Sequence, residues 1–194
     1  MSPILLLGAV IWLRLMNDKK LFALRISDLD NAAEISKKWA THTVSILDSD
    51  LTRETLCIND SFHKKFYENI IPKQTNGVLL YRCYFDDVIP KDDFGLIVAT
   101  LENIQNVLNF TEKLTPDAKL LIHCGAGISR SCAVAVGVLC QHGLTPAEAL
   151  EKVFLVRKGA YPNAHIISLM DKALGLKNTL ENALKLALPM QIKG

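Results

Sequence analysis

The stretch that decides the fold is residues 120–131, which read LLIHCGAGISRS. A short apolar run leads into Cys124, and glycines follow at 125 and 127. Arg130 closes the segment, and residues 131–142 are apolar almost throughout, as in a buried helix. The pattern predicts a buried strand, a tight loop and a central helix, with a thiol where the strand meets the loop.

This loop has the composition of an anion site with a nucleophile at its base. A helix N-terminus and a nearby arginine both favour the thiolate form of a cysteine, which is its reactive form. The two glycines free the backbone to curl so that successive N–H groups point inward, and a phosphate group fits such a nest. The planar guanidinium of Arg130, six residues after Cys124, can hold two phosphate oxygens.

The roles expected in the loop follow from these chemistries. Cys124 is the expected nucleophile and Arg130 the expected phosphate-binding cation. Ser131 is expected to donate a hydrogen bond to the sulfur and help it leave, while His123 supports the loop by hydrogen bonding. The residues expected to bind the phosphate are Gly125, Ala126, Gly127, Ile128, Ser129 and Arg130.

Outward from the loop, strand-like and helix-like segments alternate. Ser27 or Asp28 can cap the first helix, and Thr145 and Glu148 form a capping box. This alternation predicts an α/β domain with a central, mostly parallel sheet flanked by helices. Strands are expected at residues 21–26, 43–47, 78–85 and 119–123, and helices at 31–40, 61–69, 95–114, 131–142, 145–156 and from 164 onward.

The composition excludes several function classes. The chain has 194 residues, enough for one domain with a full core, and 49% of them are apolar. A net charge of +2 argues against a nucleic-acid binder, which carries a strong basic excess. The five cysteines show no paired spacing, which favours reduced thiols in a cytoplasmic protein over a disulfide framework. No metal-ligand cluster is visible, so neither a metal nor another cofactor is expected.

The N-terminus is set apart from the rest of the chain. Residues 4–13 are apolar, but a bilayer span takes about 20 residues. No basic side chain precedes this run and no small-residue cleavage site follows it, so a secretory signal is not favoured. The expected organisation is a leader at 1–20 and a single domain at 21–194, without membrane association. The sequence leaves the oligomeric state open.

Residues 123–131, HCGAGISRS, fill the signature HC-x5-R-[ST], and here the sequence resembles the cysteine-dependent protein tyrosine phosphatase superfamily. Its AGISRS run is most similar to dual-specificity phosphatases and small bacterial predicted tyrosine phosphatases. The likeness extends over about residues 21–175 and includes the pair Pro162-Asn163. The resemblance implies the fold of these phosphatases. It also implies a two-step hydrolysis of phosphate monoesters through a thiophosphoryl enzyme on Cys124. The implied substrate is a phosphorylated protein or peptide, with phosphotyrosine before phosphoserine and phosphothreonine.

Four aspartates compete for the role of general acid. Phe85-Asp86-Asp87 lies where the superfamily carries its acid, and related enzymes with an F-D-D run use the second aspartate, which favours Asp87. Asp86 is one alternative. Asp92, which has the spacing common among dual-specificity enzymes, and Asp93 are the others, although both could instead cap the helix that follows.

Three other functions share parts of this pattern. A phosphoinositide phosphatase often carries lysines inside the loop, and residues 125–129 hold none. A pseudophosphatase would bind phosphotyrosine without turnover, but here both the loop and acid candidates are present. Arsenate reductases and low-molecular-weight phosphatases place the same motif near the N-terminus, whereas this loop lies beyond the midpoint of the chain.

Overall fold

Four parallel strands form one sheet in the order β1-β4-β2-β3. The computed structural model describes residues 21–51, 67, 69–91 and 95–191. The inner strands β2 and β4 are almost wholly buried, as is usual for a parallel sheet covered on both faces. The strands are β1 (Ala23–Ser27), β2 (His42–Leu47), β3 (Leu79–Tyr84) and β4 (Lys119–His123).

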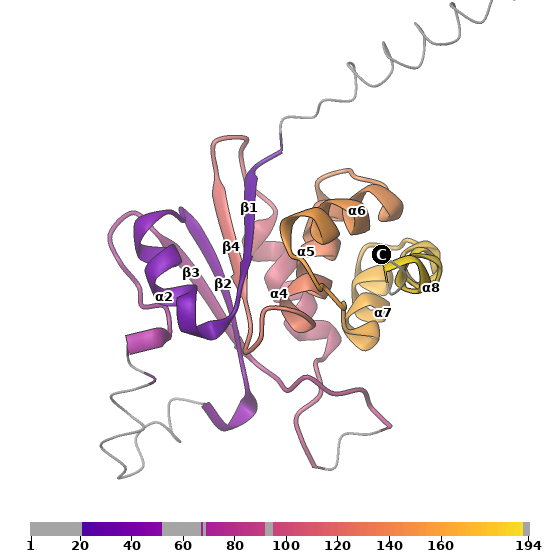
Figure 1. Ribbon diagram of the computed structural model, residues 1–194, viewed down its shortest axis with the longest axis horizontal. Helices are drawn as coiled ribbons and strands as arrows, with labels where there is room; N and C mark the ends of the chain where they lie inside the picture. Colours follow the sequence, from indigo (N-terminus) through magenta and orange to yellow (C-terminus); the bar gives the residue numbers. More distant parts are fainter. Residues whose placement is uncertain (1–20, 52–66, 68, 92–94, 192–194) are drawn as a thin grey trace, which may run out of the picture.

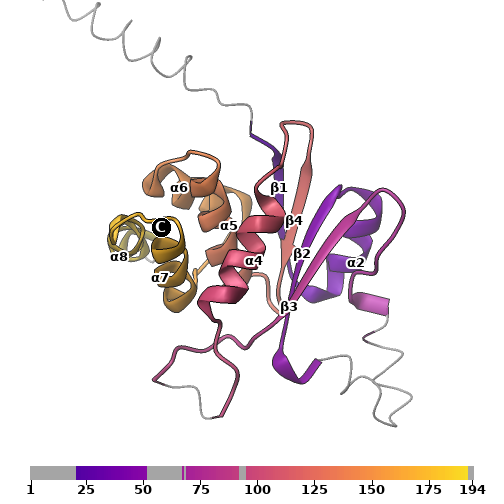
Figure 2. The same ribbon diagram turned by 180° about the vertical axis from the view of Figure 1, so that it is seen from behind.

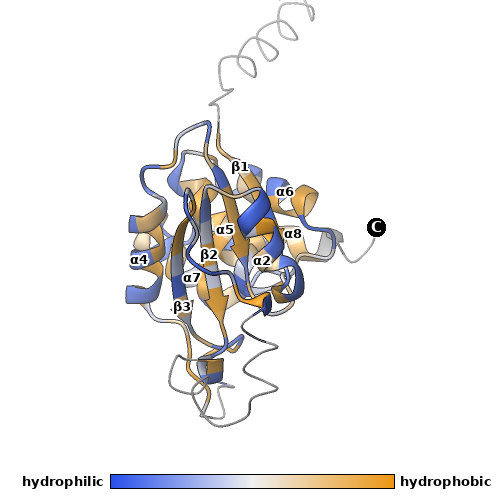
Figure 3. Cartoon of the chain, turned by 90° about the vertical axis from the view of Figure 1, so that its left-hand side faces the viewer, coloured by the Kyte–Doolittle hydropathy of each residue, from blue (hydrophilic) through white to orange (hydrophobic). Residues whose placement is uncertain are grey.

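Helices cover both faces of this sheet (Figures 1 and 2). Helix α2 lies on one face and the later helices lie on the other, with α8 packed on α6 and α7. Apolar residues concentrate in the sheet and α5, whereas α2 and α4 carry polar residues on their outer sides (Figure 3). The helices are α2 (Leu29–Lys38), the 3-10 turn η1 (Ser49–Leu51), α4 (Leu101–Thr111), α5 (Arg130–Gln141), α6 (Pro146–Val156), α7 (Ala164–Ala173) and α8 (Thr179–Gln191).

Helix α5 is the centre of the larger helical layer. Every residue from Arg130 to Leu139 is buried. At Gly137 the helix approaches α7 so closely that an added Cβ would overlap the side chain of Met170. Because interiors are close-packed, α5 cannot shift along its axis without disturbing α7. The first turn of α5, which ends the predicted phosphate loop, is therefore fixed by the core.

The predicted α/β class and the parallel sheet are confirmed, and most elements lie where the sequence placed them. The strand predicted at 119–123 has those bounds as β4. Asp28 rather than Ser27 caps α2, which begins at Leu29, two residues before the predicted start. The capping box of Thr145 and Glu148 is present at α6.

The helix predicted for residues 95–114 is shorter in the structure, where α4 begins at Leu101. Thr100 and Asn103 form a reciprocal capping box, which fixes the first turn. Leu96, whose spacing suggested a longer helix, is 49% exposed, and the next N–H, of Ile97, donates to Asp86 at 2.8 Å. The residues before Thr100 belong instead to the segment that carries the acid candidates.

A helix begins at Ala164 as predicted, but it is not the last one, because α7 ends at Ala173 and a further helix, α8, follows it. Lys177 and Asn178 adopt left-handed conformations, with φ of 54° and 66°, which a continuous helix does not allow. The buried carboxylate of Asp171 accepts from the N–H groups of Asn178 and Leu180, each at 2.7 Å. A side chain of α7 thus satisfies the start of α8.

Two other predictions fall largely on residues outside the described ranges. They are the leader at 1–20 and most of the helix at 61–69, of which Tyr67 and Asn69 are described and helical. Within the described residues, no helix is long and apolar enough to cross a membrane.

Candidate active site

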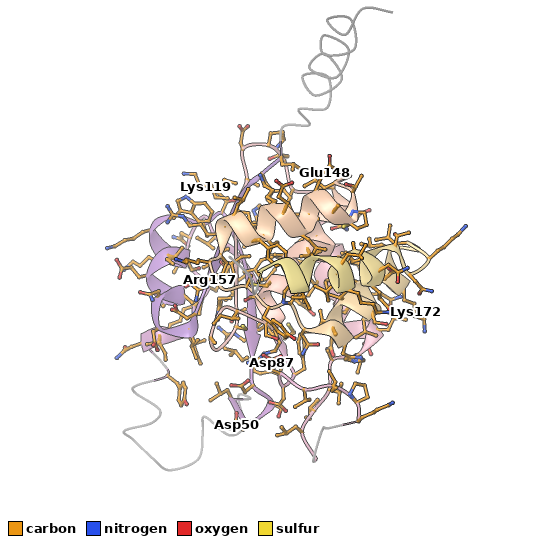
Figure 4. The ribbon with its side chains drawn as sticks, turned by 45° about the vertical axis from the view of Figure 1, so that its right-hand side comes forward. Asp50, Asp87, Lys119, Glu148, Arg157 and Lys172 are labelled. Carbon is orange, nitrogen blue, oxygen red and sulfur yellow. The ribbon has the colours of Figure 1, made fainter. Side chains whose placement is uncertain are left out.

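The predicted loop lies at the carboxyl end of the parallel strands. Ser45 of β2 pairs with His123 of β4, so the residues that follow these two strands meet at one edge of the sheet. In open α/β sheets this edge is where ligands bind. Figure 4 shows Asp87 and Asp50 at this end of the molecule, opposite Lys119, where β4 begins. Cys124 is the first residue after β4 and is 1% exposed.

The loop after Cys124 turns its carbonyl groups outward. The carbonyl of Gly125 accepts from the Leu29 N–H at 2.9 Å, that of Ala126 from Arg157 Nη2 at 2.9 Å, and that of Ile128 from the Tyr161 N–H at 2.9 Å. The Gly127 carbonyl faces the Cys132 thiol at 3.6 Å, and that of Ser129 accepts from Ala133 and Asn163. Five consecutive carbonyls are thus engaged by the surrounding protein.

This outward arrangement determines the direction of the N–H groups. In a trans peptide unit the carbonyl and the following N–H point in opposite directions, and the described chain has no cis peptide bond. The N–H groups of residues 126–130 therefore point into the concave side of the loop, as in an anion-binding nest. The first turn of α5 adds the positive end of its helix dipole.

Gly127 is the residue that makes this curvature possible. Its φ of 68° lies in the left-handed region, and an added Cβ would overlap the backbone of Ser27 at the end of β1. Glycine is therefore needed at position 127 for two reasons: the left-handed backbone conformation and the close approach of the loop to the end of β1.

Arg130, the first residue of α5, is buried, with 4% of its surface exposed. Its Nη1 donates to the Phe85 carbonyl at 2.8 Å and lies 2.6 Å from Oδ1 of Asp48. Its Nε has no hydrogen-bond partner among the described residues and lies 4.0 Å from Oδ2 of Asp87. One edge of the guanidinium is therefore held by the protein, and Nε remains available to an oxyanion.

Ser131 and His123 flank the thiol. The Ser131 hydroxyl is buried and lies 3.3 Å from Sγ of Cys124. His123 is fully buried, with Nε2 at 2.8 Å from the Ser45 hydroxyl. Burial lowers the pKa of His123 to about 4, so this imidazole is neutral at physiological pH. A neutral, hydrogen-bonded His123 fits a supporting role better than proton transfer.

The two adjacent aspartates of the F-D-D run have different environments. The Asp86 carboxylate is buried and accepts from Ser49 N, Ser49 Oγ and Ile97 N at 2.5–2.9 Å. Burial alone would raise the pKa of Asp86, but the hydrogen bonds from Ser49 and Ile97 outweigh it and lower that pKa. Asp86 is thus a structural carboxylate that ties the acid segment to the chain after β2.

Asp87 faces the loop instead. Its side chain is 37% exposed, and its Oδ1 accepts from Ser129 Oγ and from Asn163 Nδ2, each at 2.8 Å. Of the four acid candidates, Asp86 and Asp87 are described, and only Asp87 of these two contacts the loop. Asp92 and Asp93 lie outside the described residues.

Comparison with solved structures identifies the architecture. The chain superimposes on human DUSP28 with a TM-score of 0.54 at 20% identity, covering 80% of this chain and 90% of that one. A mouse putative dual specificity phosphatase, solved with zinc tungstate, gives a TM-score of 0.53 at 20% identity, covering 80% and 84%. The fold is that of the dual-specificity phosphatases. No protein-family model and no curated protein matches the sequence.

Within this dual-specificity phosphatase fold, sequence reasoning missed Asp48. This aspartate directly follows β2, is 44% exposed, and pairs with Arg130. A polar residue after a buried inner strand, next to the strand that carries the thiol, is a signal that could have identified it. The Phe85 carbonyl, which also holds Arg130, leaves no such signal because it is a main-chain group.

The described residues also bear on metal binding and on the state of the thiols. Within the part of the chain that the structure describes, no group of three or more histidines, cysteines or acids could hold a metal ion. The cysteines of that part are free thiols: Cys83, Cys124, Cys132 and Cys140. Burial raises the pKa of Cys83 and Cys132 to about 12, so these two neighbours of the site are protonated.

Proposed function

We propose that this protein hydrolyses phosphate monoesters of phosphorylated proteins or peptides, phosphotyrosine first, through a thiophosphoryl intermediate on Cys124. The observation that carries the proposal is the loop of five outward carbonyls between a buried thiol and a buried arginine. Inward N–H groups, a helix N-terminus and a guanidinium on one concave surface suit the three equatorial oxygens of a transferring phosphoryl group.

In the first step, the thiolate of Cys124 attacks phosphorus. The S–P bond forms as the bond between phosphorus and the leaving oxygen breaks. Asp87, in its carboxylic acid form, donates a proton to that oxygen, so the product leaves as a neutral alcohol or phenol. Support for Asp87 comes from its contact with Ser129 of the loop.

In the second step, the Asp87 carboxylate takes a proton from water while the water oxygen attacks phosphorus. The S–P bond breaks and the sulfur leaves as a thiolate, which restores the resting enzyme. The Ser131 hydroxyl, 3.3 Å from Sγ, is suited to stabilise the departing sulfur. Neither step needs a metal ion or an organic cofactor.

The surroundings of the loop favour a phosphorylated side chain over an inositol phosphate headgroup. Asp48 and Asp87 place two carboxylates beside Arg130, which disfavours a ligand with several phosphates. Ile128 and Tyr161 are exposed next to the loop and joined by a backbone hydrogen bond, which offers an apolar contact for an aromatic ring. A cytoplasmic protein, as expected from cysteine usage, fits the free thiols of the described residues.

The test compares the wild-type protein with Cys124→Ser on p-nitrophenyl phosphate, phosphotyrosyl and phosphoseryl peptides, and phosphoinositides. The proposal expects wild-type turnover that is greatest on phosphotyrosyl peptides and lost in Cys124→Ser. A preference for phosphoinositides would reassign the substrate. Binding of phosphotyrosyl peptide without any turnover would make the protein a pseudophosphatase and overturn the proposal.

A further inference from the structure

The side chain of Asn163 joins the start of helix α7 to the acid segment. Its Oδ1 accepts from the N–H groups of His165 and Ile166, at 3.0 and 3.1 Å, and so caps α7. Because the amide oxygen is engaged there, the amide nitrogen must point the other way. That nitrogen, Nδ2, lies 2.8 Å from Oδ1 of Asp87 and can only donate to it. The capping role therefore fixes the orientation of the amide.

Ser129 provides the second donor to the same oxygen. Its hydroxyl donates to Oδ1 of Asp87 at 2.8 Å. Ser129 occupies the N-cap position of α5 but makes no capping bond with its side chain, so the hydroxyl is not needed by the helix. Two donors from two different helix starts thus converge on one carboxyl oxygen.

The other oxygen of Asp87 has a different surrounding. Oδ2 lies 4.0 Å from Nε of Arg130, a buried nitrogen without a hydrogen-bond partner among the described residues. An oxygen that already accepts two hydrogen bonds cannot also carry a proton directed at either donor, because each donor hydrogen occupies that direction. When Asp87 is a carboxylic acid, the proton therefore belongs on Oδ2, on the side of the guanidinium that would hold the phosphoryl group.

We infer that Asn163 is a positioning residue which, together with Ser129, selects Oδ2 as the proton-carrying oxygen of Asp87. This inference rests on the proposed function. In the first step the Oδ2–H bond breaks and the proton moves to the leaving oxygen. In the second step Oδ2 takes the proton from water. Oδ1 remains an acceptor throughout, so the carboxyl group does not rotate between the steps.

The same turn of α7 also holds the far end of the acid segment. His165 Nε2 contacts the Ala99 carbonyl at 2.8 Å, and at the other end Asp86 accepts from the Ser49 N–H at 2.9 Å. The chain from Asp86 to Ala99 is therefore attached at both of its ends to the structure around the site. This restraint explains how two hydrogen bonds, from Asn163 and Ser129, can define the orientation of a partly exposed carboxyl group.

The experiment measures kcat/KM on aryl phosphates whose phenols range from strongly to weakly acidic. Asn163→Ser keeps a good capping residue but removes the amide donor. We expect a loss of about tenfold for weakly acidic phenols and a much smaller loss for strongly acidic ones, because only the former need a well-placed acid. Asn182→Ser, the same change at an exposed residue of α8, is the matched control and should follow the wild type.

Two further variants, Ser129→Ala and Asp87→Asn, keep the test decisive. Ser129 is the N-cap residue of α5 but makes no capping bond with its side chain, so Ser129→Ala removes the other donor without breaking a capping hydrogen bond and remains informative if Asn163→Ser does not fold. It should show the same dependence on the leaving group, and neither change should have a further effect in an Asp87→Asn background. Equal losses across all phenols, or a full additional loss in that background, would overturn the inference.

The outcomes also separate the inference from the proposed function. A wild-type protein without phosphatase activity would contradict the proposed function itself. Suppose instead that the wild type is active and that Asp87→Asn lowers kcat/KM mainly for weakly acidic phenols. If Asn163→Ser and Ser129→Ala do not show this dependence, the proposed function stands and only the positioning role of Asn163 is contradicted.

Discussion

The proposed nucleophile side and the proposed acid side of the site are built in different ways. The nucleophile side is one continuous segment, from β4 through the loop into α5. The acid side is assembled from distant segments, since Asp87 contacts Ser129 and Asn163, and Asp86 contacts Ser49. Cys124 is 1% exposed, whereas Asp87 is 37% exposed. The difference indicates that the core fixes the position of the thiol, while a few hydrogen bonds fix the position of the acid.

Arg130 belongs to both sides, so its substitution should have the largest effect. We expect Arg130→Lys to lower kcat by about 10²–10³-fold, because an ammonium cannot hold Phe85, Asp48 and an oxyanion with one rigid fork. Steady-state kinetics on p-nitrophenyl phosphate measure this loss. Arg157→Lys is the matched control, since Arg157 contacts the Ala126 carbonyl from outside the loop. Similar losses of kcat in both variants would contradict the proposal that Arg130 holds the oxyanion.

The acid side predicts a loss that depends on the leaving group. Asp87→Asn should lower kcat/KM by about 10²-fold for phosphotyrosine and weakly acidic phenols, because a carboxamide cannot donate an acidic proton. Strongly acidic phenols should lose much less. The neighbouring Asp50→Asn, at the same end of the molecule (Figure 4), should retain the wild-type dependence. Uniform slowing by Asp87→Asn would assign the acid to another residue.

The nucleophile side predicts a loss of stability. Gly127→Ala should lower the free energy of unfolding by about 3 kcal/mol, because it combines a left-handed φ with overlap against Ser27. Gly159→Ala is the matched control. Gly159 also has a positive φ, of 76°, but an added Cβ there meets no atom within 4 Å. Denaturant unfolding should show the larger loss at Gly127. Equal losses would mean that the close approach to β1 does not matter.

The pH dependence of stability tests the buried His123. In the folded protein its pKa is about 4, below the ordinary 6.5, so unfolding takes up a proton between these values. Stability contributed by the neutral form is present above pH 6.5 and is lost as the pH falls towards 4, by about 2 kcal/mol at pH 5. Denaturant unfolding at pH 7.5 and pH 5 should show this excess loss in the wild type relative to His123→Asn. Parallel losses would contradict it.

The same contrast explains what could be predicted from the sequence. Strand β4, the loop and α5 form a local pattern of apolar residues, glycines and an arginine, so their places follow from spacing along the chain. The bounds of β4 were predicted without error for this reason. Gly127 was also predicted to bend the loop, although its close approach to Ser27 depends on the fold of β1.

The parts that could not be predicted depend on contacts between distant residues. Asp48 and Asp87 meet Arg130 only because β2, β3 and β4 are neighbours in the sheet. The periodicity over 95–114 favoured a longer helix, but the tertiary bond from Ile97 to Asp86 holds the preceding chain outside α4. The break between α7 and α8 depends on the buried Asp171, a capping residue nine positions before Leu180.

The central claim is that Cys124 forms a covalent bond to phosphorus, and trapping that bond tests it most directly. In Asp87→Asn the second step loses its base, so the intermediate should accumulate during turnover of an aryl phosphate with a strongly acidic phenol. Rapid quenching, tryptic cleavage after Lys119 and Arg130, and mass spectrometry should find the added phosphate on residues 120–130, at Cys124. A phosphate on His123, or turnover with an unmodified peptide throughout, would contradict the account.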